Sequence, residues 1–121
     1  MRLLDSNIII YATQTAHADL LPLLYDAGSY VSEITKLEVL GYHGFDEVSK
    51  QNMNDLFETL QIISVNSRAI DKAITLRQIR KMSIGDSIIA AVALIKDYEI
   101  NTRNVSDFNW IPELAVFNPL K

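Results

Sequence analysis

The sequence predicts an α/β fold in which helices flank a short, mainly parallel sheet of four to five strands. Two observations support this class: helical and strand-like patterns alternate along the chain, and no linker, repeat or low-complexity segment interrupts them. A third observation is the composition of the chain. The chain has 121 residues, of which 49 % are hydrophobic and 21 % charged, so we expect one globular domain with a substantial core.

The elements follow from the spacing of apolar residues and from their polar ends. Short strands are predicted up to Asp5 and over 29–32, 61–65, 99–102 and 114–117. Helices are predicted over 6–14, 18–27, 33–42, 46–60, 67–81 and 86–98, with a turn or short helix over 104–110.

The helix over 86–98 is the most apolar, so we expect it to lie buried against the sheet. Apolar spacing assigns an inward face to the other long helices; it includes Ile34, Leu37, Leu40, Val48, Met53, Leu56, Phe57, Leu60, Ile70, Ala73, Ile74, Leu76 and Ile79. Ser6 or Asn7 is expected to cap the first helix, and Asp86 to begin the most apolar one.

Composition restricts the chemistry that the protein can perform. There is no cysteine, which excludes disulfides and thiolate metal sites, and neither His17 nor His43 belongs to a pair with ligand spacing. Any metal must therefore have oxygen ligands, which favours Mg²⁺ or Mn²⁺. The net charge of −4 argues mildly against nucleic-acid binding, although a cluster of carboxylates would lower it without forbidding a polyanionic substrate.

No signal peptide or membrane segment is recognisable. Asp5 follows only two leucines, and the longest apolar run, Ile88 to Ile95, is too short to cross a bilayer. We therefore expect a cytoplasmic protein without a membrane partner.

Polar side chains stand at the ends of several predicted elements. Asp5 ends the first strand, Glu38 borders the apolar face of a helix, and Asp86 begins the most apolar helix. A later strand is followed by Thr102, Asn104 and Asp107. Polar residues of these types are also common in ordinary turns. Taken singly, Asp5 and Asp86 are equally explained as helix caps and Glu38 as a solvated glutamate.

A doubly wound fold gathers such positions at one edge of its sheet. Carboxylates brought together there repel one another and raise each other's pKa, and a cation removes the repulsion. The acids therefore predict a centre in which one or two Mg²⁺ or Mn²⁺ ions support phosphodiester hydrolysis.

Four segments resemble the PIN-domain ribonucleases, and most of all the short VapC-type toxins of toxin–antitoxin pairs. They are Leu3-Leu4-Asp5-Ser6-Asn7, Thr35-x-x-Glu38, Asp86-Ser87-Ile88-Ile89-Ala90-Ala91-x-Ala93 and Thr102-Arg103-Asn104-x-x-Asp107-Phe108. The resemblance implies a three-layer PIN-like domain over 1–121 that cuts single-stranded RNA with Mg²⁺ or Mn²⁺.

The resemblance also implies roles for individual residues. Asp5, Glu38 and Asp86 match the metal-binding acids of the family, and Thr102 matches its hydroxyl position. The fourth acid falls at or near the turn from Asn104 to Asp107. Asn104 stands where some relatives have Asp, so either residue is a candidate for the fourth ligand.

Partners follow from the same resemblance, which implies a homodimer and a cognate antitoxin that lies across the acidic groove. The region from about 20 to 60 is the expected surface, with Tyr42, Phe45, Met53 and Phe57 as candidate anchors; Met53 and Phe57 are equally explained as core. Basic residues near the acids are candidates for RNA binding, with Arg103 and Lys81 first and Arg77 and Arg80 next.

Two other functions remain open at this stage. A PIN fold that has lost activity would serve as a binding protein, and Asn104 keeps that possibility. A receiver-like signalling domain has similar length and class, but it needs an Asp at the end of its third strand, where this chain has Ile63-Ser64-Val65-Asn66.

Overall fold

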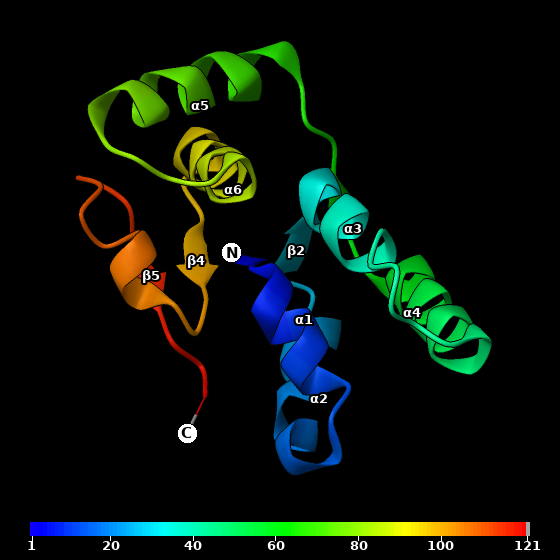
Figure 1. Cartoon of the computed structure of the whole chain (residues 1–121). Coiled ribbons are helices and arrows are strands. Elements are labelled where there is room, and N and C mark those ends of the chain that lie inside the picture. The colour runs from blue at the N-terminus through cyan, green and yellow to red at the C-terminus, as the bar shows by residue number, and fades with distance from the viewer. Residues whose placement is uncertain (121) are drawn as a thin grey trace.

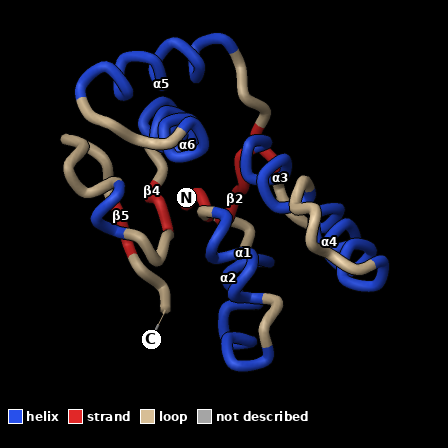
Figure 2. Tube along the Cα trace, viewed as in Figure 1, coloured by secondary structure: helices blue, strands red, loops and turns tan. Residues whose placement is uncertain are grey.

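A computed structural model describes residues 1–120 and contains a sheet of five parallel strands in the order β3-β2-β1-β4-β5. The strands are β1 (Arg2–Leu4), β2 (Ser29–Ser32), β3 (Ile62–Ile63), β4 (Glu99–Asn101) and β5 (Val116–Phe117). The predicted α/β class with a short parallel sheet is therefore confirmed (Figures 1 and 2).

Helices cover both faces of this sheet. They are α1 (Ser6–Ala12), α2 (Leu21–Tyr25), α3 (Glu33–Leu40), α4 (Glu47–Thr59), α5 (Ser67–Ile79) and α6 (Ile84–Lys96), with 3₁₀ helices η1 (Thr15–Leu20) and η2 (Val105–Asp107). In Figure 1, α5 and α6 lie above the sheet, whereas α1 and α2 lie below it.

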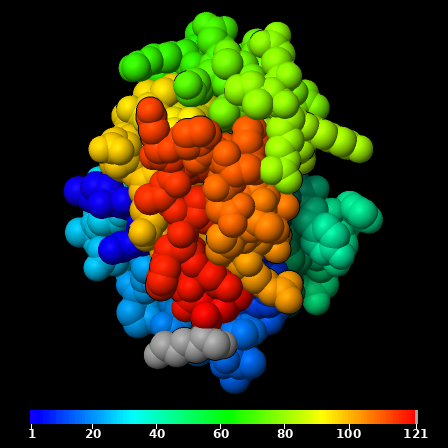
Figure 3. Space-filling model, turned by 90° about the vertical axis from the view of Figure 1, so that its left-hand side faces the viewer, coloured from blue at the N-terminus to red at the C-terminus, as the bar shows by residue number. Residues whose placement is uncertain are grey.

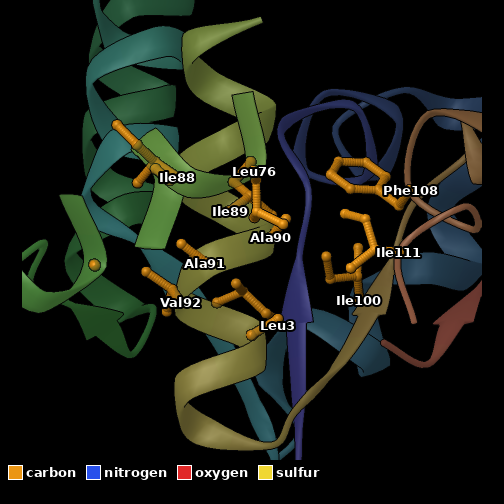
Figure 4. Close-up of a cluster of buried hydrophobic side chains, with 13 residues drawn as sticks. Leu3, Leu76, Ile88, Ile89, Ala90, Ala91, Val92, Ile100, Phe108 and Ile111 are labelled. Atoms are coloured by element: carbon orange, nitrogen blue, oxygen red, sulfur yellow. The ribbon is translucent and has the colours of Figure 1, made fainter. Parts of the chain in front are cut away.

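The central strand β1 divides the core into two halves. Side chains alternate along a strand, so Leu3 and Leu4 point to opposite faces, and both are fully buried. Leu3 packs with residues of α5, α6 and Ile100, as Figure 4 shows, whereas Leu4 packs with residues of α1 to α4. The chain thus forms three layers: helices, sheet and helices.

Helix α6 is the most buried helix, as its composition predicts. Ile89, Ala90, Ala91 and Ala93 are completely buried, and the helix packs between α5 and the sheet. Small alanine side chains let the helix axis approach the strands closely, and Figure 4 shows Ala90 and Ala91 on the part of α6 that runs beside β1.

Two predicted caps are wrong. Asp5, not Ser6 or Asn7, caps α1: its carboxylate accepts a bond from the Ser6 N–H. Ser83, not Asp86, caps α6, because its hydroxyl accepts from the Asp86 N–H. The helix consequently begins two residues earlier than predicted, and Asp86 lies within its first turn, where a carboxylate still interacts favourably with the helix dipole.

The predicted helix over 18–27 is also wrong in form. The chain instead makes the 3₁₀ helix η1 and the five-residue α2, with a non-helical backbone at His17. Pro22 lies in the first turn of α2, where the missing N–H has no helical partner to lose. Most other helices end one or two residues before their predicted limits.

Several residues predicted to face inward are exposed. Ile70, Ile74 and Ile79 of α5 are 41 %, 51 % and 68 % exposed, because only Ala69, Ala73 and Leu76 of that helix are buried against the core. Leu37 and Val48 are exposed as well. Met53 and Phe57 are buried, so these two belong to the core and are unavailable as anchors for a partner.

No helix within residues 1–120 is long and apolar enough to cross a membrane.

Candidate active site

The site begins where β1 and β4 end side by side. Leu4 pairs with Asn101, so the next residues, Asp5 and Thr102, emerge as neighbours at the carboxyl edge of the sheet. The Asp5 N–H continues the ladder by donating to the Asn101 carbonyl (2.9 Å). The Thr102 hydroxyl then donates to Asp5 Oδ2 at 2.8 Å, which joins the two strand ends through their side chains.

Asp5 is the most enclosed acid of the site, with 5 % of its surface exposed. Oδ1 accepts from the Ser6 N–H (2.8 Å), and Oδ2 accepts from Thr102 and from Asn7 Nδ2 (3.2 Å). Burial raises the pKa of Asp5 despite these bonds, and the charges of Glu38 and Asp107 raise it further. A buried carboxylate with fixed partners is a rigid oxygen donor.

Asn7 joins the two sides of this edge. Its Nδ2 reaches both Asp5 and the Thr102 hydroxyl (3.3 Å), and its Oδ1 accepts from the Arg103 N–H (3.1 Å). The sequence indicates only a capping role for Asn7 and does not predict these bonds. Its position two residues after a strand-ending Asp was the available signal.

Glu38 approaches from α3, which follows β2 and is capped by Ser32. Its Oε1 accepts a bond from the Ser6 hydroxyl (3.1 Å), so Ser6 holds Glu38 beside Asp5. Burial raises the pKa of Glu38, and the nearby Asp86 carboxylate raises it further.

Gly85 leaves the space that Glu38 occupies. A Cβ atom at Gly85 would overlap the Glu38 carboxyl group, coming within 2.9 Å of its Cδ. The sequence showed Gly85 only as a poor helix former, yet its missing side chain lets the Glu38 carboxylate lie against the first turn of α6.

Asp86 adds a third acid from α6. Burial, followed by the charges of Asp5 and Asp107, raises the pKa of Asp86 to about 6. The pKa values of Asp5, Glu38 and Asp86 are thus all raised, and in each case another acid of the group contributes. Contributions of this kind mean that these carboxylates are near enough to raise one another's pKa.

The turn after β4 supplies Asp107 rather than the Asn104 side chain. Asp107 lies in η2, its charge acts on both Asp5 and Asp86, and it lines a cavity with Asp86. Asn104 contributes its backbone N–H, which donates to Thr102 Oγ1 (3.0 Å). Both Asn104 and Asp107 are exposed. The geometry therefore favours Asp107 over Asn104 as the fourth acidic position.

A cavity of about 520 Å³ opens beside these acids. Asp86 and Asp107 lie on its wall together with Arg77, Arg80 and Lys81. Arg103 lies elsewhere: its guanidinium group is over the Tyr11 ring, 5.6 Å from the ring centroid. Three of the four basic residues predicted to bind RNA therefore share one cavity with two of the acids.

Comparison by sequence matches no protein-family model and no curated protein. Comparison of structures finds a chain of a toxin–antitoxin complex from Klebsiella pneumoniae, 28 % identical, with a TM-score of 0.77, covering 100 % of this chain and 99 % of that one. A chain of VapBC-1 from Haemophilus influenzae is 25 % identical, with a TM-score of 0.76 and coverages of 97 % and 96 %. A chain of FitAcB from Neisseria gonorrhoeae is 22 % identical, with a TM-score of 0.80, and the match covers 98 % of both chains.

The chain has the fold of the VapC-type PIN-domain toxins. The resemblance predicted from four short segments is therefore confirmed, and so is the three-layer arrangement. Within this VapC-type fold, Asp5, Glu38, Asp86 and Asp107 come from four different elements and meet at one edge of the sheet.

Divalent-cation binding requires more than proximity. Within residues 1–120, no group of three or more His, Asp or Glu side chains is arranged so that it could hold a metal ion. Instead Asp5 and Glu38 are engaged by Ser6, Asn7 and Thr102. The donor chemistry nevertheless fits Mg²⁺ or Mn²⁺, since all donors are oxygens. The pKa values of Glu38 and Asp86 are raised first by burial and then by neighbouring acids, and a cation would offset both effects.

Proposed function

We propose that this protein is a metal-dependent endoribonuclease that cleaves phosphodiester bonds of single-stranded RNA, and that it is the toxin of a toxin–antitoxin pair. The main support is the meeting of four carboxylates at the carboxyl edge of the sheet, where three of them have raised pKa values. The structural likeness to chains of toxin–antitoxin complexes supports the same proposal.

In this proposal Asp5, Glu38, Asp86 and Asp107 bind Mg²⁺ or Mn²⁺, with Asn104 as the alternative to Asp107. A bound divalent cation would supply activation of a water molecule and stabilisation of the leaving oxygen. Such a cation would favour the ionised form of each acid, which reverses the upward pKa shifts of the metal-free site.

The neutral side chains orient the acids. The Thr102 hydroxyl donates its only proton to Asp5 and accepts bonds from Asn7 and from the Asn104 N–H. With its proton committed in this way, Thr102 fixes the Asp5 carboxylate rather than attacking the substrate. Ser6 does the same for Glu38.

In this proposal the basic residues bind the RNA backbone. Arg77, Arg80 and Lys81 lie on the cavity wall beside Asp86 and Asp107, where they would contact phosphates next to the cleaved bond. Arg103 directly follows Thr102 and is the candidate contact on the other side of the acids.

We further propose that the protein forms a homodimer and binds a cognate antitoxin. The solved neighbours include a toxin–antitoxin complex and VapBC assemblies, which supports a protein partner. Of the predicted anchors, Tyr42 is 56 % exposed and packs edge to face against Phe45. This aromatic pair remains available for an interface.

Cleavage of RNA by single-site variants tests the function. Asp5→Asn and Asp86→Asn should each abolish Mn²⁺-dependent cleavage of single-stranded RNA while the circular dichroism spectrum stays that of the parent. Asp19→Asn is the matched control, because Asp19 is an exposed acid outside the cluster. Cleavage by either site variant at the parent's rate would show that the metal-site assignment is wrong.

Calorimetric titration with Mn²⁺ distinguishes the ribonuclease from the alternative, an inactive binding protein with a PIN fold. If the protein is a ribonuclease, Mn²⁺ should bind to the parent and should bind much more weakly to Asp5→Asn. A parent that takes up no Mn²⁺ and cleaves no RNA, but still binds an antitoxin, would favour the inactive alternative.

A further inference from the structure

The cavity beside the acids has an unusual arrangement of charges. Arg77, Arg80 and Lys81 line it together with Asp86 and Asp107. The one ion pair within residues 1–120, however, joins Arg2 to Asp26 on another part of the surface. Opposite charges in one cavity attract each other, yet both arginines are engaged by groups other than the acids.

Arg80 has an aromatic partner. Its guanidinium carbon lies 5.3 Å from the centroid of the Trp110 ring, within the range of a cation–π interaction. The interaction with tryptophan is worth about 0.5–2 kcal/mol, depending on solvent exposure. A salt bridge between exposed side chains contributes no more free energy than this. The Trp110 ring can therefore compete with Asp86 and Asp107 for the Arg80 guanidinium.

Trp110 is itself held in place. The residue packs against the hydrophobic core that surrounds α6, and its Nε1–H donates to the carbonyl of Asp107 at 3.0 Å. Figure 3 shows the surroundings: the orange segment that contains η2 lies against the yellow-green segment at the end of α5. The ring is thus a fixed surface on which Arg80 rests.

Arg77 is occupied in a similar way. Its Nε–H donates to the Met82 carbonyl at 3.2 Å, which is a neutral acceptor. Both arginines consequently keep their full charge while they lie next to two carboxylates. The acids also remain free of arginine, as a site that must bind a cation requires.

A guanidinium that stacks on a ring uses its face and leaves its N–H donors free at the edge. Those donors match the paired oxygens of a phosphate group, with which arginine forms bidentate bonds. We propose that Trp110 is a positioning residue that holds the Arg80 guanidinium on the cavity wall, where it binds an RNA phosphate beside the acidic site. The proposal rests on the proposed function, since it takes single-stranded RNA as the ligand.

Binding without cleavage is the decisive measurement. A fluorescently labelled single-stranded RNA is titrated with the protein in chelator, and anisotropy gives the affinity at several salt concentrations. Loss of one phosphate contact should lower the slope of log K against log salt by about 0.7, the value for single strands. Trp110→Leu and Arg80→Met should each show this loss.

A double variant shows whether the two residues act together. If Trp110 acts through Arg80, Trp110→Leu combined with Arg80→Met should bind RNA no more weakly than Arg80→Met alone. Trp110→Phe retains an aromatic face and should recover most of the parent's affinity. Arg68→Met is the matched control and should keep the parent's slope, because Arg68 lies at the start of α5 and lines a different cavity.

The single tryptophan of the chain offers a direct signal. Removal of the guanidinium in Arg80→Met should change the emission of Trp110 in the free protein. RNA should also change the emission of the parent, whereas this response should be much smaller in Arg80→Met. Melting temperatures of all variants show that each remains folded.

Failure of this inference is distinct from failure of the proposed function. Steady-state cleavage with Mn²⁺ should give Trp110→Leu a raised KM and a kcat near the parent's, the sign of lost substrate binding. If the parent cleaves RNA but Trp110→Leu keeps the parent's KM and salt slope, the role of Trp110 is wrong and the function stands. The role of Trp110 is also wrong if the losses of RNA affinity in Trp110→Leu and Arg80→Met add up in the double variant. If Trp110→Leu loses binding but the parent never cleaves RNA, only the function fails.

Discussion

Three acids of the site are less stable as carboxylates than they would be in water. Asp5, Glu38 and Asp86 all have raised pKa values, and burial is the largest cause for each of them. Raised acid pKa values mean that the folded protein binds protons more tightly than the unfolded chain. The metal-free site therefore opposes folding at neutral pH, and the rest of the core offsets this cost.

Asp86→Asn tests this cost through the dependence of stability on pH. The pKa of Asp86 rises from 3.8 to about 6 on folding, so its favourable contribution is complete below pH 3.8 and disappears as the pH passes 6. We expect Asp86→Asn to melt at about the parent's temperature near pH 4 and several degrees higher above pH 6.5, both in chelator. Equal melting temperatures at pH 7 would show that Asp86 is not under electrostatic strain.

Gly85→Ala tests how closely Glu38 is held. Alanine favours a helix by about 0.8–1.0 kcal/mol over glycine, so the variant should remain folded and should not lose stability. The new Cβ would displace the Glu38 carboxylate, which is the flexible end of its side chain. Calorimetry should then show Mn²⁺ affinity reduced roughly 10- to 100-fold, as expected when the orientation of a ligand is disturbed. Unchanged affinity would mean that Glu38 is not a ligand.

Individual residues show what sequence could and could not predict about the site. Asp5, Asp86 and Thr102 were candidates because each lies at the end or start of an apolar element, and Glu38 because it borders the apolar face of a helix. The preference for Asp107 over Asn104 as the proposed fourth acid was not predictable, because it depends on the path of the three-residue η2 helix. Trp110 and Gly85 were missed because their neighbours, Arg80 and Glu38, are distant in sequence.

At the scale of elements, α3 contains a buried hydroxyl without a partner. Within residues 1–120, Thr35 Oγ1 is the single buried side-chain polar atom that makes no hydrogen bond, and Thr35 is completely buried. Such a group costs about 1–3 kcal/mol relative to a satisfied one. It lies one turn before Glu38, on the helix that places this acid.

Thr35→Val should therefore stabilise the protein. Valine has nearly the same shape as threonine and lacks the unpaired hydroxyl, so we expect about 1 kcal/mol of added stability in urea unfolding. Thr35→Ser is the matched control: it keeps the hydroxyl, loses a buried methyl group and should be less stable than the parent. A Val variant less stable than the parent would show that the hydroxyl has a partner.

Element boundaries and faces were predictable where packing on one side determines them. The apolar run of α6 and the strand-ending acids gave the correct order of elements. The inward face of α5 was wrong because its isoleucines lie outside the narrow stripe that contacts α6. Spacing identifies an apolar stripe, but only the neighbouring element decides how much of that stripe is covered.

For the whole molecule, the proposed cation should act as a stabilising ligand. A ligand that binds only the folded state adds about 2.7 kcal/mol at a concentration of one hundred times its Kd. Mn²⁺ should thus raise the melting temperature of the parent and leave that of Asp5→Asn nearly unchanged. An equal rise in both proteins would indicate binding elsewhere on the surface.

The sheet order also has a consequence for the timing of synthesis. Strand β1 lies between β2 and β4, and the partner that fixes Asp5, Thr102, is 97 residues further along the chain. At translation rates of roughly 5–20 residues per second, the ribosome needs about 5–20 s to make the intervening residues. A nascent chain that has not yet reached Thr102 therefore lacks a formed site. If the protein is a toxin, it is harmless until Thr102 has been made, and a co-translated partner has those seconds in which to fold first.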